Sequence, residues 1–281
     1  MNTLRLTIAI AIAAILTAGC TRNFYSSYPQ PVTLFTQQGE FQITVAHSHE
    51  PSSTAQTKTK EVPTLDGGTT TAQRRHVYAR NGSNTSMQGA YAITNHLAVA
   101  AGLSFYRKGI DAPDNDYDGI NYGEAAVGYY RPLGGIFTAE VYGGAGLSSQ
   151  HHVFTDLGHA DAKSVKCFVQ PNIGLSVPLF DMGLSSRVSS VSYFGIDNQV
   201  SPTGLSWAAQ DHASVEYLRN RTFLLIEPAF TVRTGWKWLK VQYQFAAVWQ
   251  LSNTDLILHG LDEFSHRHYL GIVYTFGRKY E

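Results

Sequence analysis

The stretch LKVQYQFAAVWQL, residues 239–251, decides the fold. Every second residue from Leu239 to Leu251 is apolar or aromatic, and the residues between them begin with Lys240 and include three glutamines. A helix with about 3.6 residues per turn cannot separate the two kinds in this way. The stretch therefore predicts a β-strand with one apolar face and one largely polar face.

The same alternation recurs along the chain from residue 39 onward, and it predicts ten strands in all. The expected strands are residues 39–48, 86–94, 97–108, 121–133, 136–149, 163–178, 182–196, 221–234, 237–251 and 266–277.

The connections between these strands alternate between two kinds. The tight turns are Asn95-His96, Gly134-Gly135, residues 179–181 and Gly235-Trp236. The long polar loops are residues 49–85, 109–120, 150–162, 197–220 and 252–265. Tight turns at one rim, long loops at the other and an even strand count are typical of outer-membrane barrels. We therefore predict an all-β fold over residues 39–281, a ten-stranded antiparallel transmembrane β-barrel with short periplasmic turns and long extracellular loops.

Charge is confined to one face of the expected strands. The alternative is a soluble barrel with its apolar face turned inward around a ligand, but an exported chain with ten such strands favours the apolar face outward. The charges expected in the lumen are Glu140, Arg187, Glu227, Arg233 and Lys240. Because their signs are mixed, we expect ion pairs that plug the lumen rather than a selective pore.

Composition excludes other classes of protein. The 281 residues carry 21 Lys and Arg against 21 Asp and Glu, and only 15% of residues are charged. A neutral chain lacks the basic surface of a nucleic-acid-binding protein. The sequence also lacks the run of about 18 apolar residues that a spanning helix requires. Low charge suits a surface that faces lipid.

The N-terminus has the features of an export signal. Arg5 precedes an apolar run from residue 6 to 16, and small residues lead to Cys20. The stretch LTAGC resembles a bacterial lipobox, although Thr17 stands where lipoboxes prefer leucine. The resemblance implies a signal peptide over 1–19, an N-terminal lipid on Cys20 and a periplasmic tether over 20–38, with the lipid in the inner leaflet. The alternative is an ordinary signal peptide with an incidental cysteine.

Two further stretches carry a family resemblance. The last strand, YLGIVYTF over residues 269–276, is similar to the terminal signal that the barrel-assembly machinery recognises. Residues 31–40 and 91–97 resemble those of poorly characterised Bacteroidota outer-membrane β-barrel lipoproteins. The resemblance implies a location and a fold but no reaction. The expected partners are outer-membrane lipids and the barrel-assembly machinery, with the chain as its client or associated subunit.

An acidic stretch in the second long loop is a candidate calcium site. Asp114, Asp116 and Asp118 alternate and are followed by Gly119, as in the first half of a calcium-binding loop. The acid expected at the twelfth position is missing, since Ala125 stands there. The alternative, which we favour, is an acidic turn that binds only water. No other cofactor is expected.

Histidines form a second candidate site near the outer rim. His47 and His49 end the first expected strand, and His266 and His268 begin the last, which barrel closure makes its neighbour. Imidazole pairs bind zinc or copper. One alternative is that these histidines hydrogen-bond the phosphates of lipopolysaccharide. The other alternative is a set of interfacial histidines without a ligand, and this alternative is favoured.

Two enzymatic alternatives rest on incomplete patterns. Asp114 and Asp116 with Asp211-His212 resemble the catalytic loops of omptin proteases, but that pair is adjacent rather than spaced by one residue. Residues 250–253, QLSN, resemble the signature of a lipid A deacylase, but Gln250 replaces the histidine base.

No complete catalytic constellation emerges from the sequence. We therefore expect a non-enzymatic structural or interaction subunit of an envelope complex, with loops 49–85 and 197–220 as its partner surfaces. A narrow channel is the remaining alternative.

Overall fold

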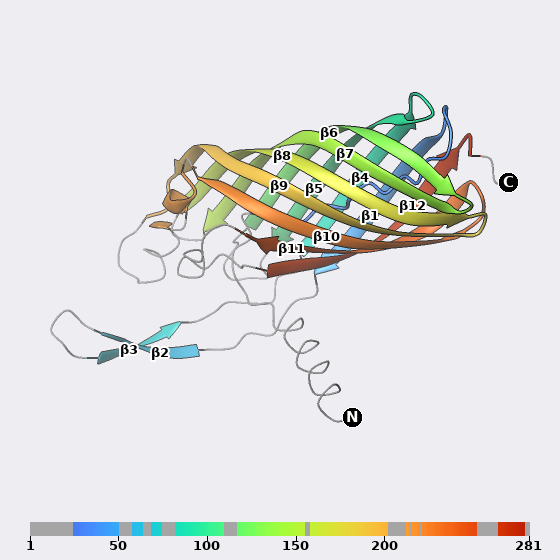
Figure 1. Cartoon of the computed structure of the whole chain (residues 1–281). Coiled ribbons are helices and arrows are strands. Elements are labelled where there is room, and N and C mark those ends of the chain that lie inside the picture. The colour runs from blue at the N-terminus through green and yellow to red at the C-terminus, as the bar shows by residue number, and fades with distance from the viewer. Residues whose placement is uncertain are drawn as a thin grey trace, which may run out of the picture.

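The computed structural model describes residues 25–50, 58–63, 69–74, 82–109, 117–154, 158–201, 212–213, 215–219, 221–251 and 264–278. Ten of its strands close into one barrel, with every neighbouring pair antiparallel (Figure 1). The prediction of a closed ten-stranded antiparallel barrel is confirmed.

The strands follow the alternating segments of the sequence. The barrel strands are β1 (Phe41–Glu50), β4 (Gly82–Ala92), β5 (Leu97–Gly109), β6 (Tyr117–Gly134), β7 (Phe137–Phe154), β8 (Gly158–Val177), β9 (Phe180–Asn198), β10 (Thr222–Gly235), β11 (Leu239–Gln250) and β12 (Phe264–Phe276). Chain neighbours pair in sequence order from β4 to β12, and β1 closes the barrel between β12 and β4. Phe41 of β1 lies opposite Phe276 on one side and Tyr91 on the other.

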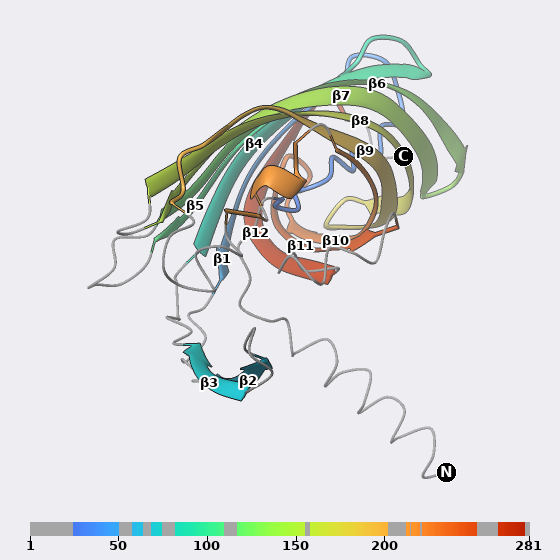
Figure 2. The same cartoon turned by 90° about the vertical axis from the view of Figure 1, so that its left-hand side faces the viewer.

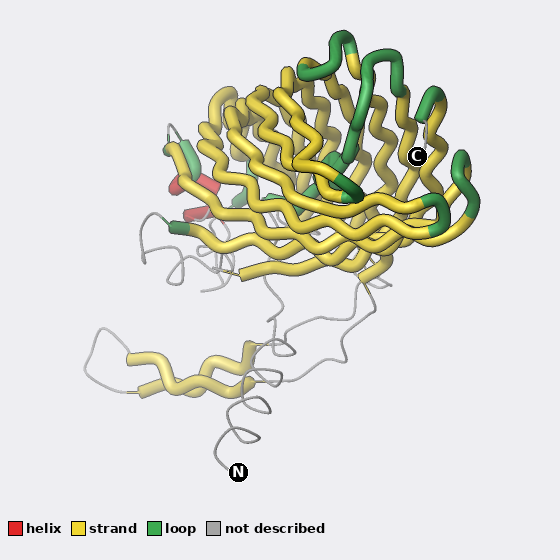
Figure 3. Tube along the Cα trace, turned by 45° about the vertical axis from the view of Figure 1, so that its right-hand side comes forward, coloured by secondary structure: helices red, strands yellow, loops and turns green. Residues whose placement is uncertain are grey.

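Two differences from the expected elements lie on the loop side. The first long loop contains a separate hairpin of β2 (Lys58–Pro63) and β3 (Thr69–Arg74). Its strand sequences, KTKEVP and TTTAQR, have no apolar face, so their periodicity gave no signal. β6, β7 and β8 also extend beyond their expected ends toward the long loops, while Figure 3 shows short turns at the opposite rim.

The outer surface of the barrel is apolar and its interior is polar. Leu147 and Leu270 point outward and are 62% and 64% exposed, whereas Arg187 and Glu227 point inward and are fully buried. A continuous apolar surface of this kind is stable in lipid rather than in water. The apolar face is therefore outward, as the sequence predicted. No helix in the part of the chain that the structure describes is long and apolar enough to cross a membrane.

The lumen contains the chain's own N-terminal segment. Residues 26–35 are buried, and the segment enters β1 through a reversal at Gly39, whose φ is +84° (Figure 2). The expected periplasmic tether over residues 20–38 is therefore wrong for the described residues from Tyr25 onward. The apolar and proline-rich sequence of this segment fits an interior position better than a solvated linker.

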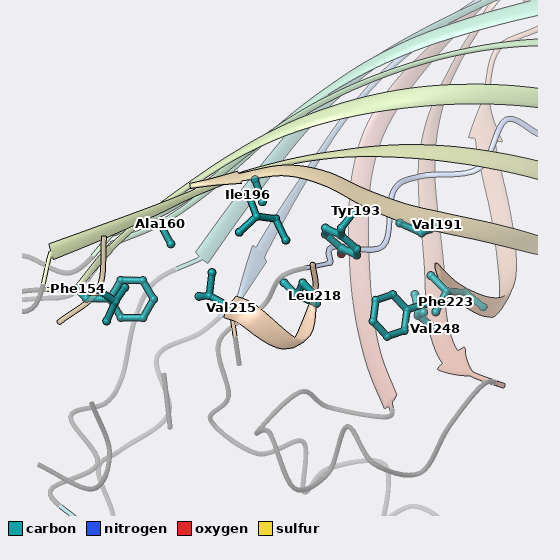
Figure 4. Close-up of a cluster of buried hydrophobic side chains, with 12 residues drawn as sticks. Phe154, Ala160, Val191, Tyr193, Ile196, Val215, Leu218, Phe223 and Val248 are labelled. Atoms are coloured by element: carbon teal, nitrogen blue, oxygen red, sulfur yellow. The ribbon is translucent and has the colours of Figure 1, made fainter. Parts of the chain in front are cut away.

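A cluster of apolar side chains lies at the long-loop rim, on the side of the barrel formed by β7 to β11 (Figure 4). It contains Phe154, Ala160, Ala162, Val191, Tyr193, Ile196, Val200, Val215, Leu218, Phe223, Leu225 and Val248. Val215 and Leu218 come from the short helical segment near residues 212–219, which lies across the mouth in Figure 2. Tyr25 packs against the same cluster from the lumen.

Candidate functional site

The lumen satisfies the backbone of the N-terminal segment with side chains instead of a neighbouring strand. The Gln244 amide accepts a hydrogen bond from the Gln30 N–H at 2.8 Å and donates one to the Gln30 carbonyl at 3.0 Å. The amides of Gln170 and Asn172 both donate to the carbonyl of Pro31, at 2.7 Å and 3.0 Å. Buried backbone groups require such partners. These polar residues therefore form a receptor for an extended segment.

Two prolines reduce the number of hydrogen bonds that the barrel wall must provide to the backbone of this segment. Pro29 and Pro31 have no N–H, so each leaves only its carbonyl to be satisfied. Gln88 donates to the Pro29 carbonyl. Proline also prevents the segment from joining the barrel as a central strand.

A buried ion pair lies at the N-terminal end of this segment, beside Tyr25. Lys166 of β8 contacts Glu227 of β10 at 2.8 Å, and both side chains are at most 2% exposed. The Tyr25 hydroxyl donates to Glu227 at 2.8 Å and accepts from the Lys166 ammonium at 2.5 Å. The ammonium also lies 5.2 Å and 5.7 Å from the ring centres of Tyr25 and Tyr28. The N-terminal segment thus takes part in a charged network.

A second ion pair crosses the lumen. Arg187 of β9 donates to both carboxylate oxygens of Glu124 of β6, at 2.8 Å and 3.0 Å. Its Nε donates to Gln170 at 2.9 Å, and its guanidinium stacks 4.0 Å from the ring centre of Phe168. A bidentate pair between strands that are not neighbours braces the barrel across its interior.

Glu140 binds the N-terminal segment near the turn rim. Its carboxylate accepts hydrogen bonds from the Thr33 hydroxyl at 2.5 Å, the Thr33 N–H at 3.2 Å and the Phe35 N–H at 3.3 Å. Asn172 adds a fourth at 3.0 Å. Hydrogen bonds to a carboxylate compensate for burial of its charge.

At the turn rim, an ion pair joins the residue just before β1 to the chain just beyond β12. Arg278 contacts Glu40 at 2.8 Å and donates to the Thr33 carbonyl at 2.7 Å. Glu40 also accepts from the backbone N–H groups of Thr36 and Gln37, at 2.9 Å and 3.0 Å. The reversal before β1 is thereby fixed to the end of the chain.

The remaining charges expected in the lumen also lie there. Lys240 contacts Asp181 at 2.7 Å, and both side chains are at most 4% exposed. Arg233 is buried and donates to Gln242 at 2.8 Å and to Gln42 at 3.4 Å. All five charges named from the sequence therefore face the interior, and Glu140 is held by neutral partners.

Only one of the three candidate calcium residues lies in the part of the chain that the structure describes. Asp114 and Asp116 lie outside the described residues. Asp118 does not belong to a loop, since it is a buried residue of β6 whose carboxylate lies 2.9 Å from Nδ1 of the buried His152. Within the described ranges there is no group of three or more His, Cys, Asp or Glu residues placed to hold a metal.

The four candidate histidines, His47, His49, His266 and His268, lie on the outer face. This follows from their positions in β1 and β12, because alternate residues of a strand face opposite sides. Nδ1 of His47 lies 2.9 Å from the Thr85 hydroxyl of β4, and Nδ1 of His268 lies 2.7 Å from the Tyr243 hydroxyl of β11. His266 and His268 are in edge-to-face contact with ring centres 5.6 Å apart. These contacts engage His47 and His268 with hydroxyl groups of different strands.

The two enzymatic patterns are only partly visible in the described chain. Of the omptin-like set, His212 is described, and its carbonyl accepts a hydrogen bond from Asn198 at 3.1 Å. Asp211 lies outside the described residues, as do Ser252 and Asn253 of the deacylase-like stretch.

Comparisons with known proteins give a distant structural likeness. No protein-family model and no curated protein matches the chain. The translocator domain of the autotransporter NalP from Neisseria meningitidis is similar at a TM-score of 0.45 and 10% identity, over 96% of this chain and 95% of that one. An outer-membrane channel from Pseudomonas putida F1 is similar at 0.38 and 11%, over 92% and 100%. OprG from Pseudomonas aeruginosa is similar at 0.34 and 13%, over 87% and 99%. These values assign no function to this chain.

Proposed function

We propose that this chain is a bacterial outer-membrane β-barrel, lipid-anchored through Cys20, that acts as a non-enzymatic structural or interaction subunit of an envelope complex. The observation that carries the proposal is the filled lumen, in which the chain's own residues 26–35 are buried and hydrogen-bonded to the barrel wall. A barrel whose interior is occupied in this way has its outer surface and its loops left for function.

The ion pairs support a closed interior. Glu124, Lys166, Arg187 and Glu227 form two pairs of opposite sign at 2.8 Å, and each side chain is at most 7% exposed. Conduction requires a continuous wet path along which ions bind weakly. Charges that are buried and paired with each other do not provide such a path.

A planar-bilayer experiment tests the closed lumen. An ideal Cβ built on Gly183 lies 3.8 Å from Cβ of Val32, which is the mean separation in disulfides. We expect V32C/G183C, in a Cys167→Ser background, to form a cross-link that fixes the segment to β9. The matched control is V32C/G143C, because a Cβ on Gly143 contacts nothing within 4 Å.

Neither the parent protein nor the oxidised V32C/G183C variant should give discrete conductance steps. Steady steps from both proteins would overturn the closed lumen. Steps that appear in the parent and disappear on oxidation would also contradict it, because they would make the segment a gate.

A photo-cross-linking experiment tests the role as a subunit. A photoreactive residue replaces Ala213, which is exposed at the loop rim, or Leu179, which is 62% exposed at the turn rim. We expect Ala213 to give one defined protein adduct in native membranes and Leu179 to give none in common with it. Equal patterns from both positions, or lipid adducts alone, would contradict a partner surface formed by the loops.

The anchor is tested separately by metabolic labelling with a palmitate analogue. The label should be present in the parent protein and lost in Cys20→Ser. Label retained in Cys20→Ser would show that Cys20 is not the acylated residue.

A further inference from the structure

We infer that the chain ahead of Tyr25 leaves the barrel through the long-loop rim, so that the N-terminus and C-terminus lie on opposite sides of the membrane. If Cys20 is acylated, as proposed above, its lipid then enters the leaflet on the side of the long loops. With the tight turns in the periplasm, this is the outer leaflet.

The contacts of the segment give its direction. Gln37 donates to the carbonyl of Gly277, just beyond the end of β12 at the turn rim, at 2.6 Å. Farther from that rim, Gln30 contacts Gln244 in the middle of β11. Tyr25 contacts Glu227, which is five residues from Thr222 at the loop end of β10. Read toward the N-terminus, the segment therefore rises from the turn rim to the loop half of the lumen.

The chain between Cys20 and Tyr25 is long enough to reach the loop rim. Cys20 is five residues away, and five extended residues span at most about 18 Å. From Glu227 to the loop end of β10, five residues at about 3.3 Å and a tilt of about 40° give roughly 13 Å along the barrel axis. The turn end at Gly235 is eight residues away, or roughly 20 Å. Cys20 can therefore reach the loop rim, which is the nearer of the two.

The path back to the turn rim is also occupied. Tyr28 stacks on Tyr122 with ring centres 4.0 Å apart, and Tyr269 donates to the Ser27 carbonyl at 2.5 Å. Thr33 is bonded to Glu140 below them. A chain that turned back at residue 24 would have to displace these side chains and bury further backbone groups without partners, which is costly.

The described chain ends at the other rim. β12 ends at Phe276, and Arg278 beyond it binds Glu40 at the reversal that precedes β1. The two termini therefore leave the barrel at opposite ends. The sequence-based expectation of an inner-leaflet lipid assumed that the segment before β1 stays at the rim where β1 begins, and the filled lumen removes that assumption.

Cysteine labelling of intact cells tests the exit side. Single cysteines are introduced at Asn23, at Ala213 as the loop-rim reference and at Leu179 as the turn-rim reference, all with Cys20 retained and Cys167→Ser. The Cys167→Ser protein without an added cysteine measures any label on Cys20 itself. A membrane-impermeant maleimide is applied to intact and to lysed cells. We expect N23C and A213C to react on the same side of the membrane, and L179C on the other.

The result that overturns the inference is an N23C that reacts together with L179C. The comparison is relative, so it holds whichever rim faces the medium. It does not require acylation, because an exit at the turn rim refutes the inference even if Cys20→Ser loses palmitate label. Conversely, an exit at the loop rim stands even if no lipid is attached.

Discussion

The Lys166–Glu227 pair allows a quantitative test of the lumen network. Glu227→Gln keeps the shape of the side chain but removes the charge that compensates Lys166, whose side chain is 2% exposed, and it turns one of the two acceptor oxygens into an amide donor. Breaking a buried pair on one side costs about 3–5 kcal/mol. The Tyr25 hydroxyl at 2.5 Å and the nearby rings remain. We therefore expect the lower end, about 3 kcal/mol, or roughly a 100-fold change in the folding constant.

The double variant K166M/E227Q is the discriminating measurement. It removes both charges, and the Tyr25 and Ser189 hydroxyls, which donate to Glu227, can each donate to or accept from the amide at residue 227. Replacing a whole buried pair is often neutral, so we expect it to lie within about 1 kcal/mol of the parent protein. The assay is urea unfolding in vesicles, read from the fraction of heat-modifiable folded band on a gel. The single variant K166M completes the comparison. A loss in the double variant equal to the sum of the two single losses would refute coupling between Lys166 and Glu227.

Two further predictions concern packing and pH. A Cβ on Gly144 lies 2.4 Å from the Ala125 carbonyl oxygen, whereas one on Gly143 meets nothing within 4 Å. In the same assay, G144A should therefore lower the free energy of unfolding by about 1–3 kcal/mol, and G143A should leave it almost unchanged. Equal losses would contradict the assignment of Gly144 to the inner face and Gly143 to the outer face. In the loop helix, the hydrogen bond from Arg219 lowers the pKa of Glu216 to about 2 from its ordinary value of 4.5. The stability that ionised Glu216 gives to this helical segment is therefore complete above pH 4.5 and is lost as the pH falls toward 2. Hydrogen-exchange protection of residues 215–219 should fall across that window in the parent protein but not in Glu216→Gln.

The strands were predictable because a barrel in lipid imposes a local pattern. Each residue of β11 faces either lipid or lumen, and the alternation from Leu239 to Trp249 records that choice without reference to the rest of the chain. The inward position of Glu140 and Arg187 follows from parity alone. The hairpin of β2 and β3 was not predictable in the same way, since neither strand has an apolar face to alternate with a polar one.

The partners of the lumen charges were not predictable. Arg187 pairs with Glu124, which is 63 residues earlier, and Glu140 binds the backbone of Thr33 and Phe35 rather than a cation. Parity places a side chain on a face but does not specify its depth or its neighbour across the barrel. The prolines at 29 and 31 were a usable signal that this stretch joins no strand, although not of where it lies.

The sequence by itself determined the ten strands, the turns that join them and the face on which the five named lumen charges lie, because these depend on neighbours one or two residues away. Only the tertiary structure decided that residues 26–35 fill the lumen and that the N-terminal segment points toward the long-loop rim. That decision depends on side chains from many strands meeting one segment: Gln244, Gln170, Asn172 and Glu140 come from β11, β8 and β7. Barrel closure brings them together, and their hydrogen bonds replace the water that a solvated tether would have kept.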